Sequence, residues 1–101
     1  MTLVRLPVDA IRKTIAAVFQ PGVAMPPVET LAAQVAALVA GMQALLPAVS
    51  AAHPAHQHAQ ALLRPALRDA PRSHYELWQH TLILARCAQA LLDLTRESRT
   101  P

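Results

Sequence analysis

The chain has 101 residues, a length that fits one domain, and a formal net charge of +3 at pH 7. Hydrophobic residues make up 53% of it but aromatic residues only 3%, so an aliphatic core is expected. The single cysteine, Cys87, excludes an internal disulfide, and two glycines are too few for the phosphate-binding loops of conventional cofactor enzymes. We therefore expect one all-α domain over residues 1–101 that needs no cofactor.

The first predicted helix spans residues 7–20. Pro7 suits a helix start, and Pro21 with Gly22 ends the pattern. Its apolar residues recur at the spacing of one helix face: Val8, Ile11, Ile15 and Val18.

The second predicted helix, residues 27–52, organises the rest of the chain. Its apolar stripe follows helical spacing throughout: Leu31, Val35, Leu38, Met42, Leu45 and Val49. Pro47 lies inside this stripe, and because Val49 continues the spacing we expect a kink there rather than a helix end. No Asp, Glu, Lys or Arg occurs from Thr30 to Leu63, so other helices must cover this segment.

A membrane span is the alternative for this segment. Its length suffices, but Gln34, Gln43 and Pro47 interrupt it and no basic flank lies beside it. The first ten residues also lack the apolar core of a signal peptide. We therefore expect a soluble cytoplasmic protein with no membrane contact.

Two further helices follow. The third is predicted over residues 54–70 with a bend at Pro65, and the fourth over residues 73–97, where Ser73 and Glu76 form a capping-box pattern. Together the four segments predict a small four-helix bundle with the second and fourth helices as its central pair.

The histidines raise the possibility of a metal site. His53 and His56 are spaced i, i+3, and Glu76 and His80 are spaced i, i+4, so each pair can lie on one side of a helix. No second carboxylate lies near the first pair, and the spacing matches no established signature. We therefore expect no metal.

His80 is the candidate catalytic residue, because it lies at the edge of the apolar arc of the last helix and titrates near neutrality. Glu76 or Tyr75 would orient it, and an apolar small molecule would contact Trp78, Thr81, Leu84 and Met42. Cys87 is about 10 Å further along the helix, too far for a Cys/His nucleophile pair. The alternative is a boundary histidine that hydrogen-bonds a neighbouring helix.

Small residues form a second feature of the 27–52 helix. Ala33, Ala37, Ala40 and Ala44 make an uncharged strip that allows close approach of another helix. Such a strip meets a helix of the same chain or a second copy, and we favour a homodimer. The basic residues are too sparse to indicate a nucleic-acid partner.

Three segments carry a resemblance: LPVDAIRKTI near the start, PPVETLAAQVAALVAGMQALLPAV in the middle and WQHTLILARCAQALLDL near the end. They resemble a family of small helical proteins of unknown function encoded in actinobacterial natural-product gene clusters. A histidine commonly follows the glycine of the middle segment in that family, whereas here Met42 follows Gly41; the histidine of the last segment is retained as His80. The resemblance implies a role in or beside secondary-metabolite biosynthesis and no particular reaction.

Two functions remain open from the sequence. The first is a non-catalytic accessory protein that dimerises and docks on a biosynthetic enzyme or carrier protein. The second is a small-molecule-binding bundle, or a cofactor-free cyclase or isomerase that uses His80. The sequence identifies neither the partner nor the ligand.

Overall fold

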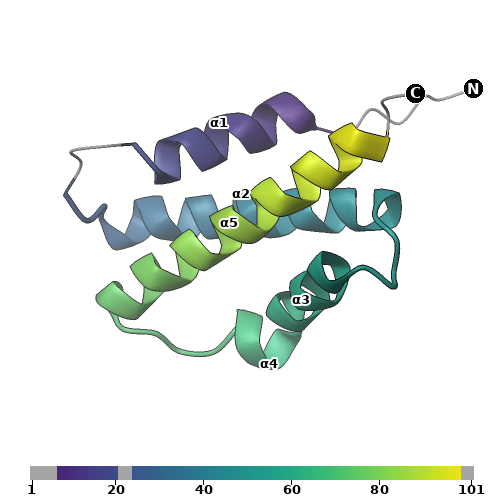
Figure 1. Cartoon of the computed structure of the whole chain (residues 1–101). Coiled ribbons are helices and arrows are strands. Elements are labelled where there is room, and N and C mark those ends of the chain that lie inside the picture. Colours follow the sequence, from purple (N-terminus) through teal and green to yellow (C-terminus); the bar gives the residue numbers. More distant parts are fainter. Residues whose placement is uncertain (1–6, 21–23, 99–101) are drawn as a thin grey trace, which may run out of the picture.

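The computed structural model describes residues 7–20 and 24–98, and most of these residues are helical (Figure 1). The elements, in chain order, are α1 (Val8–Val18), α2 (Val28–Leu45), the 3₁₀ turn η1 (Leu46–Ala48), α3 (Pro54–Leu63), α4 (Pro65–Arg68) and α5 (His74–Ser98). No strand occurs among the described residues, and four of their five α-helices have seven or more residues. The all-helical class is therefore confirmed.

Helix α5 is the element on which the others pack. It crosses α1 and α2, which run antiparallel to each other, and it also contacts α3 (Figure 1). The most extensive contact in the described chain joins α2 and α5, as the sequence predicted for the central pair.

The predicted stripe of α2 forms the middle of the core. Leu31, Leu38, Met42 and Leu45 are completely buried, and most of them join one cluster with Leu84 and Leu91 of α5. Burying a Leu side chain contributes about 1.5–3 kcal/mol, so this stripe accounts for a large part of the stability of the fold.

The predicted kinked helix over residues 27–52 is wrong beyond Leu45. Helix α2 ends there, Leu46–Ala48 form a 3₁₀ turn, and Val49 is extended with its backbone N–H donating to the Leu46 carbonyl. Pro47 cannot donate to the carbonyl of Gln43 and its ring crowds that group, which ends the helix. Val49 nevertheless reaches the core from the extended segment, which is why its spacing imitated a longer helix.

The predicted bent helix over residues 54–70 is two helices. Arg64 is extended (φ −60°, ψ 136°) between α3 and α4, because the residue before a proline is disfavoured in the helical region. The first and last helices of the chain match their predictions more closely, because α1 begins at Val8 and α5 begins at His74. Ser73 and Glu76 form the predicted capping box, in which each backbone N–H donates to the other residue's side chain.

Candidate functional site

His80 lies inside the protein, on the side of α5 that faces other helices. Its side chain is 6% exposed, and its Nε2 atom is buried without a hydrogen-bond partner. Burial lowers the pKa of this imidazole, and the Arg72 guanidinium lowers it further. At neutral pH His80 is therefore an uncharged ring, and the alternative of a histidine bonded to a neighbouring helix through Nε2 does not hold.

The two residues expected to orient His80 are occupied elsewhere. The Ser73 side chain and the Ser73 backbone N–H both lower the pKa of the Glu76 carboxylate, which accepts from that N–H and so acts as a helix cap. Tyr75 is 56% exposed, packs edge-on against Trp78 with ring centroids 6.2 Å apart, and accepts from the side-chain amide of Gln79. The structure thus does not assemble these side chains around the imidazole.

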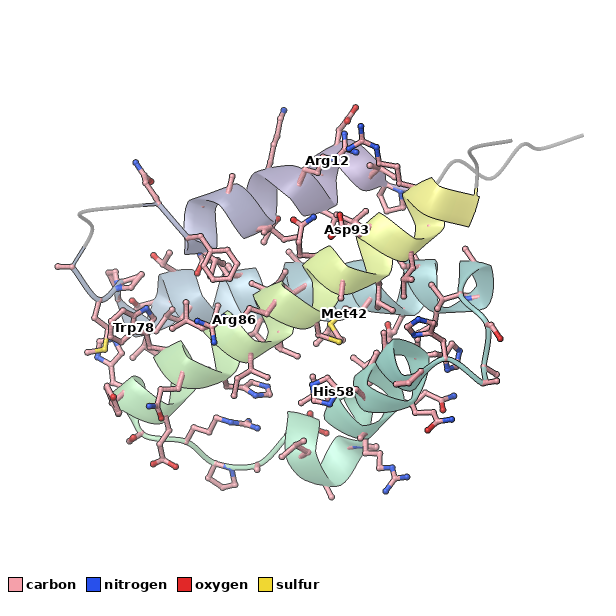
Figure 2. All side chains as sticks on the ribbon, in the orientation of Figure 1. Arg12, Met42, His58, Trp78, Arg86 and Asp93 are labelled. Atoms are coloured by element: carbon pink, nitrogen blue, oxygen red, sulfur yellow. The ribbon has the colours of Figure 1, made fainter. Side chains whose placement is uncertain are left out.

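The residues expected to contact a ligand are distributed between core and surface. Met42 and Leu84 are fully buried in the main cluster, and Figure 2 shows Met42 in the interior of the protein. Thr81 is buried too, and its hydroxyl donates to the Leu77 carbonyl at 2.8 Å. Trp78 is half-buried near the start of α5 (Figure 2). None of the five surface hollows found in the described part of the chain is lined by these residues or by His80.

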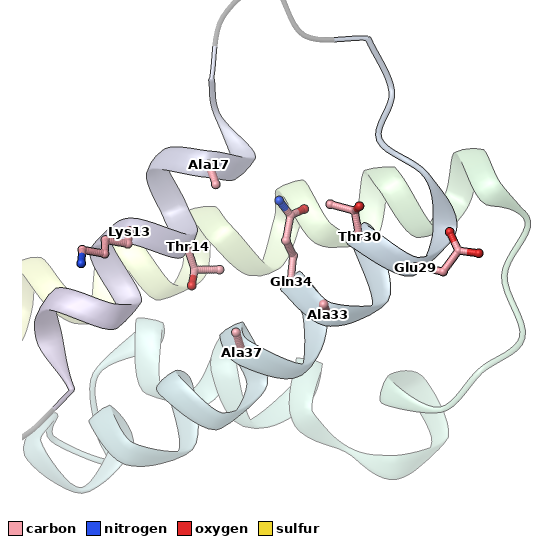
Figure 3. Close-up of a pocket in the computed structure, with 8 residues that line it drawn as sticks. All are labelled: Lys13, Thr14, Ala17, Glu29, Thr30, Ala33, Gln34 and Ala37. Carbon is pink, nitrogen blue, oxygen red and sulfur yellow. The ribbon is translucent and has the colours of Figure 1, made fainter.

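One hollow is a groove between α1 and α2, of about 570 Å³ (Figure 3). Small residues form most of its surface, Lys13 and Glu29 lie on its walls, and Gln34 projects from α2 toward α1. The Gln34 Oε1 atom is buried and has no hydrogen-bond partner. A second hollow of about 240 Å³ shares Thr14 and Ala37 with the first and continues it toward Gly41.

The two hollows together contain three of the four alanines of the predicted strip. Ala33 and Ala37 line the first hollow, Ala37 and Ala40 line the second, and all three are exposed. The sequence identified the strip and left open whether the first helix, the last helix or a second copy lies beside it, since spacing within one helix cannot decide this; the structure places α1 there.

Two other histidines, His53 and His74, have structural roles. His53 caps α3, its Nδ1 accepting from the Ala55 N–H at 3.0 Å, and His74 contacts the Pro26 carbonyl through Nε2 at 2.6 Å. Among residues 7–20 and 24–98, no group of three His, Cys, Asp or Glu side chains is arranged to hold a metal. Cys87 is buried and burial raises the pKa of its thiol, which makes it a poor nucleophile.

The segment Val28–Ala48 is long and apolar enough to cross a membrane by length and composition alone. Core helices of soluble proteins meet the same criterion, and the buried Leu stripe of α2 is such a core. Only 28% of the most apolar 18-residue window is buried, however, which leaves much uncharged surface exposed on this helix.

Comparisons with known proteins give one match. A sequence model of a protein family, a family of unknown function (DUF6415), matches residues 9–100. Curated proteins and solved structures yield no match to this chain.

Proposed function

Because this chain belongs to DUF6415, a family of unknown function, we propose its function from its surfaces: a non-catalytic interaction protein that forms a homodimer through the groove between α1 and α2. The observation that carries the proposal is the outer face of α2. It is exposed, it has no charged residue between Thr30 and the end of the helix, and it consists mainly of alanine. Small uncharged residues let two helix backbones approach closely without repulsion between identical surfaces.

Charges at the groove support a two-fold arrangement. In a symmetric dimer, residue i of one copy contacts residue j of the other and the reverse, so Lys13 and Glu29 can form two equivalent ion pairs. Helix α1 is antiparallel to α2 with Ile11 beside Gly41, which puts Lys13 near the level of Leu38.

Along α2, Gln34 lies close to the midpoint between Glu29 and the level of Lys13. A two-fold axis there brings the Gln34 amides of the two copies together. A side-chain amide has both donors and an acceptor, so two copies of Gln34 can bond reciprocally after rotation of the amide. The Oε1 atom of Gln34 is buried without a partner in the single chain, and the reciprocal bonds would satisfy it once the amide has turned outward.

The oligomeric state tests the proposal directly. We expect a dimer for the wild-type protein by sedimentation equilibrium and a monomer for Ala37→Glu, which introduces two like charges at the interface. Ala32→Glu is the matched control, because Ala32 is exposed on the other side of the same helix. Lys13→Glu should weaken the dimer, and the double exchange Lys13→Glu with Glu29→Lys should restore it. A wild-type monomer at all concentrations would refute the proposal.

The proposed dimer acts as an accessory protein in the cytoplasm, docking on an enzyme or carrier protein of secondary-metabolite biosynthesis. Support for docking comes from the end of the molecule where α2 and α5 begin. Large apolar side chains are exposed there, namely Phe19, Met25, Val28 and Tyr75. Aromatic and methionine side chains are enriched in protein interfaces. The test is co-purification with proteins encoded beside this one. We expect Tyr75→Ser to abolish that co-purification.

A second candidate function is small-molecule binding or cofactor-free catalysis by His80. One observation favours it: the Nε2 atom of His80 is buried without a hydrogen-bond partner, and a polar group of a ligand could supply one. It requires a cavity to open beside α5. A thermal-shift comparison of wild type and His80→Ala, with natural-product extracts, tests it: a ligand that stabilises only the wild type would favour this candidate.

A further inference from the structure

A separate hollow of about 260 Å³ lies between α3 and α5, away from the α1–α2 groove. Its lining comes from two helices that are far apart in the sequence: Ala55 and His58 from α3, with Ile83, Arg86, Cys87 and Ala90 from α5. Figure 2 labels the two polar members, His58 on α3 and Arg86 on α5.

The apolar part of the hollow is built for a hydrocarbon group. Ala55 and Ala90 are small and half-buried, which leaves the space open, and Ile83 is 43% exposed although it is a large aliphatic residue. The Cys87 thiol is 5% exposed, and because burial raises its pKa it contributes an uncharged surface. A ligand that covers Ile83 gains the free energy of removing that apolar area from water.

The charge in the polar part of the hollow is positive. Arg86 carries a permanent positive charge with donors arranged to meet a carboxylate in a bidentate pair, and the His58 imidazole offers a further N–H donor. No Asp or Glu is among the six lining residues, all of which belong to the described chain. The hollow therefore favours an anion over a cation or a neutral molecule.

We propose that this hollow binds a small organic monocarboxylate, with the carboxylate on Arg86 and His58 and a short apolar tail over Ile83 and Cys87. Its volume is slightly below the range of pockets that hold drug-sized ligands, so the tail is limited to a few carbon atoms. This site shares no lining residue with the groove of the proposed dimer.

Hexanoate is the probe, with neutral hexanamide as its matched control. Titration followed by ¹H–¹⁵N NMR should give saturable shifts at the amides of Ala55 and Ala90, with hexanoate binding at least roughly tenfold more tightly than hexanamide, the ratio that one charge-assisted bond supplies. Cys87 gives a second readout, because it is the only cysteine in the chain and bound hexanoate should slow its alkylation.

Three variants decide where the probe binds. Arg86→Gln should weaken hexanoate roughly tenfold or more and leave hexanamide unchanged, whereas Ala90→Leu should fill the hollow and abolish both. Arg64→Gln, which removes an exposed arginine outside the hollow, should change neither.

Two results would overturn the inference. One is the absence of saturable shifts up to about 10 mM, where even a weak site of millimolar affinity would be filled. The other is equal binding of hexanoate and hexanamide, or equal weakening by Arg86→Gln and Arg64→Gln, since either would show that Arg86 does not recognise the carboxylate. Ala37→Glu should still bind hexanoate, so failure of the dimer and failure of this site are distinguishable.

Discussion

Gly41 of α2 lies directly against Ile11 of α1, and replacing the glycine tests how that contact is built. The residue is buried in the helical interior of α2. A Cβ atom added there would lie 2.7 Å from Cγ1 and 3.0 Å from Cδ1 of Ile11. Both distances are shorter than ordinary van der Waals contact, so the Ile11 side chain or the helix that carries it must shift.

Two opposing effects determine the change in the free energy of unfolding for Gly41→Ala. Overpacking of a core typically costs about 1–3 kcal/mol. Alanine is favoured over glycine in a helix by up to about 1 kcal/mol. The expected net effect is a destabilisation of roughly 0–2 kcal/mol, which at the middle of that range lowers the melting temperature by about 4–8 °C.

A double-mutant cycle separates the two effects. Ile11→Ala removes the clashing atoms and by itself should cost about 2–5 kcal/mol. In that background Gly41→Ala should become stabilising, because only the helix preference and the filling of space remain. The sign of the alanine effect therefore reverses between the two backgrounds.

Urea unfolding followed by far-UV circular dichroism of the four proteins measures the cycle. Ala36→Gly, at an exposed position of the same helix, measures the helix preference alone and should cost about 0.5–1 kcal/mol. The packing argument is refuted if Gly41→Ala stabilises the protein by a similar amount whether residue 11 is Ile or Ala.

Two further substitutions test the start and the interior of α5. Ser73→Ala removes the capping hydroxyl and should destabilise the protein by about 0.5–2 kcal/mol in urea unfolding; no loss would mean that the capping box contributes nothing. His80→Leu removes a buried unpaired nitrogen and should be neutral or stabilising at pH 7, since leaving such a group unpaired costs about 1–3 kcal/mol. The pKa of His80 is lower in the folded protein than its ordinary value of 6.5 in the unfolded chain. The free energy of unfolding of the wild type should therefore be highest above pH 6.5 and decrease as the pH falls from 6.5 toward the folded pKa. That decrease should shrink in His80→Leu, and equal pH dependence of the two proteins would contradict it.

Helical periodicity predicted the core because burial and spacing are coupled in a regular helix. Leu31, Leu38 and Leu45 are all fully buried, as their spacing indicated. The prediction failed at Pro47, where the same spacing continued through a helix end. Periodicity reports which side chains face the core, and Val49 faces it from an extended backbone. The hydrogen bond that Pro47 cannot make indicated the helix end more reliably than the continued spacing of Val49 indicated a longer helix.

The candidate site was harder to predict, because one side chain can satisfy two patterns at once. Glu76 is spaced correctly to orient His80, but it also lies at the N3 position of a capping box. There its carboxylate accepts from the backbone N–H of Ser73, which would otherwise be unpaired. The hollow between α3 and α5 could not be predicted at all. His58 and Arg86 come together only through the packing of two helices, a relation that no local spacing contains.

The position of α5 in the chain affects how the protein forms during synthesis. Helices α1, α2 and α3 all pack on α5, yet α5 is made after them. At a synthesis rate of about 5–20 residues per second, its 25 residues take roughly 1–5 s to appear. During that time the Leu stripe of α2 lacks α5, the helix with which it makes its most extensive contact. The uncharged sequence around it is then exposed to chaperones and to other nascent copies, so successful folding depends on rapid docking of the last helix.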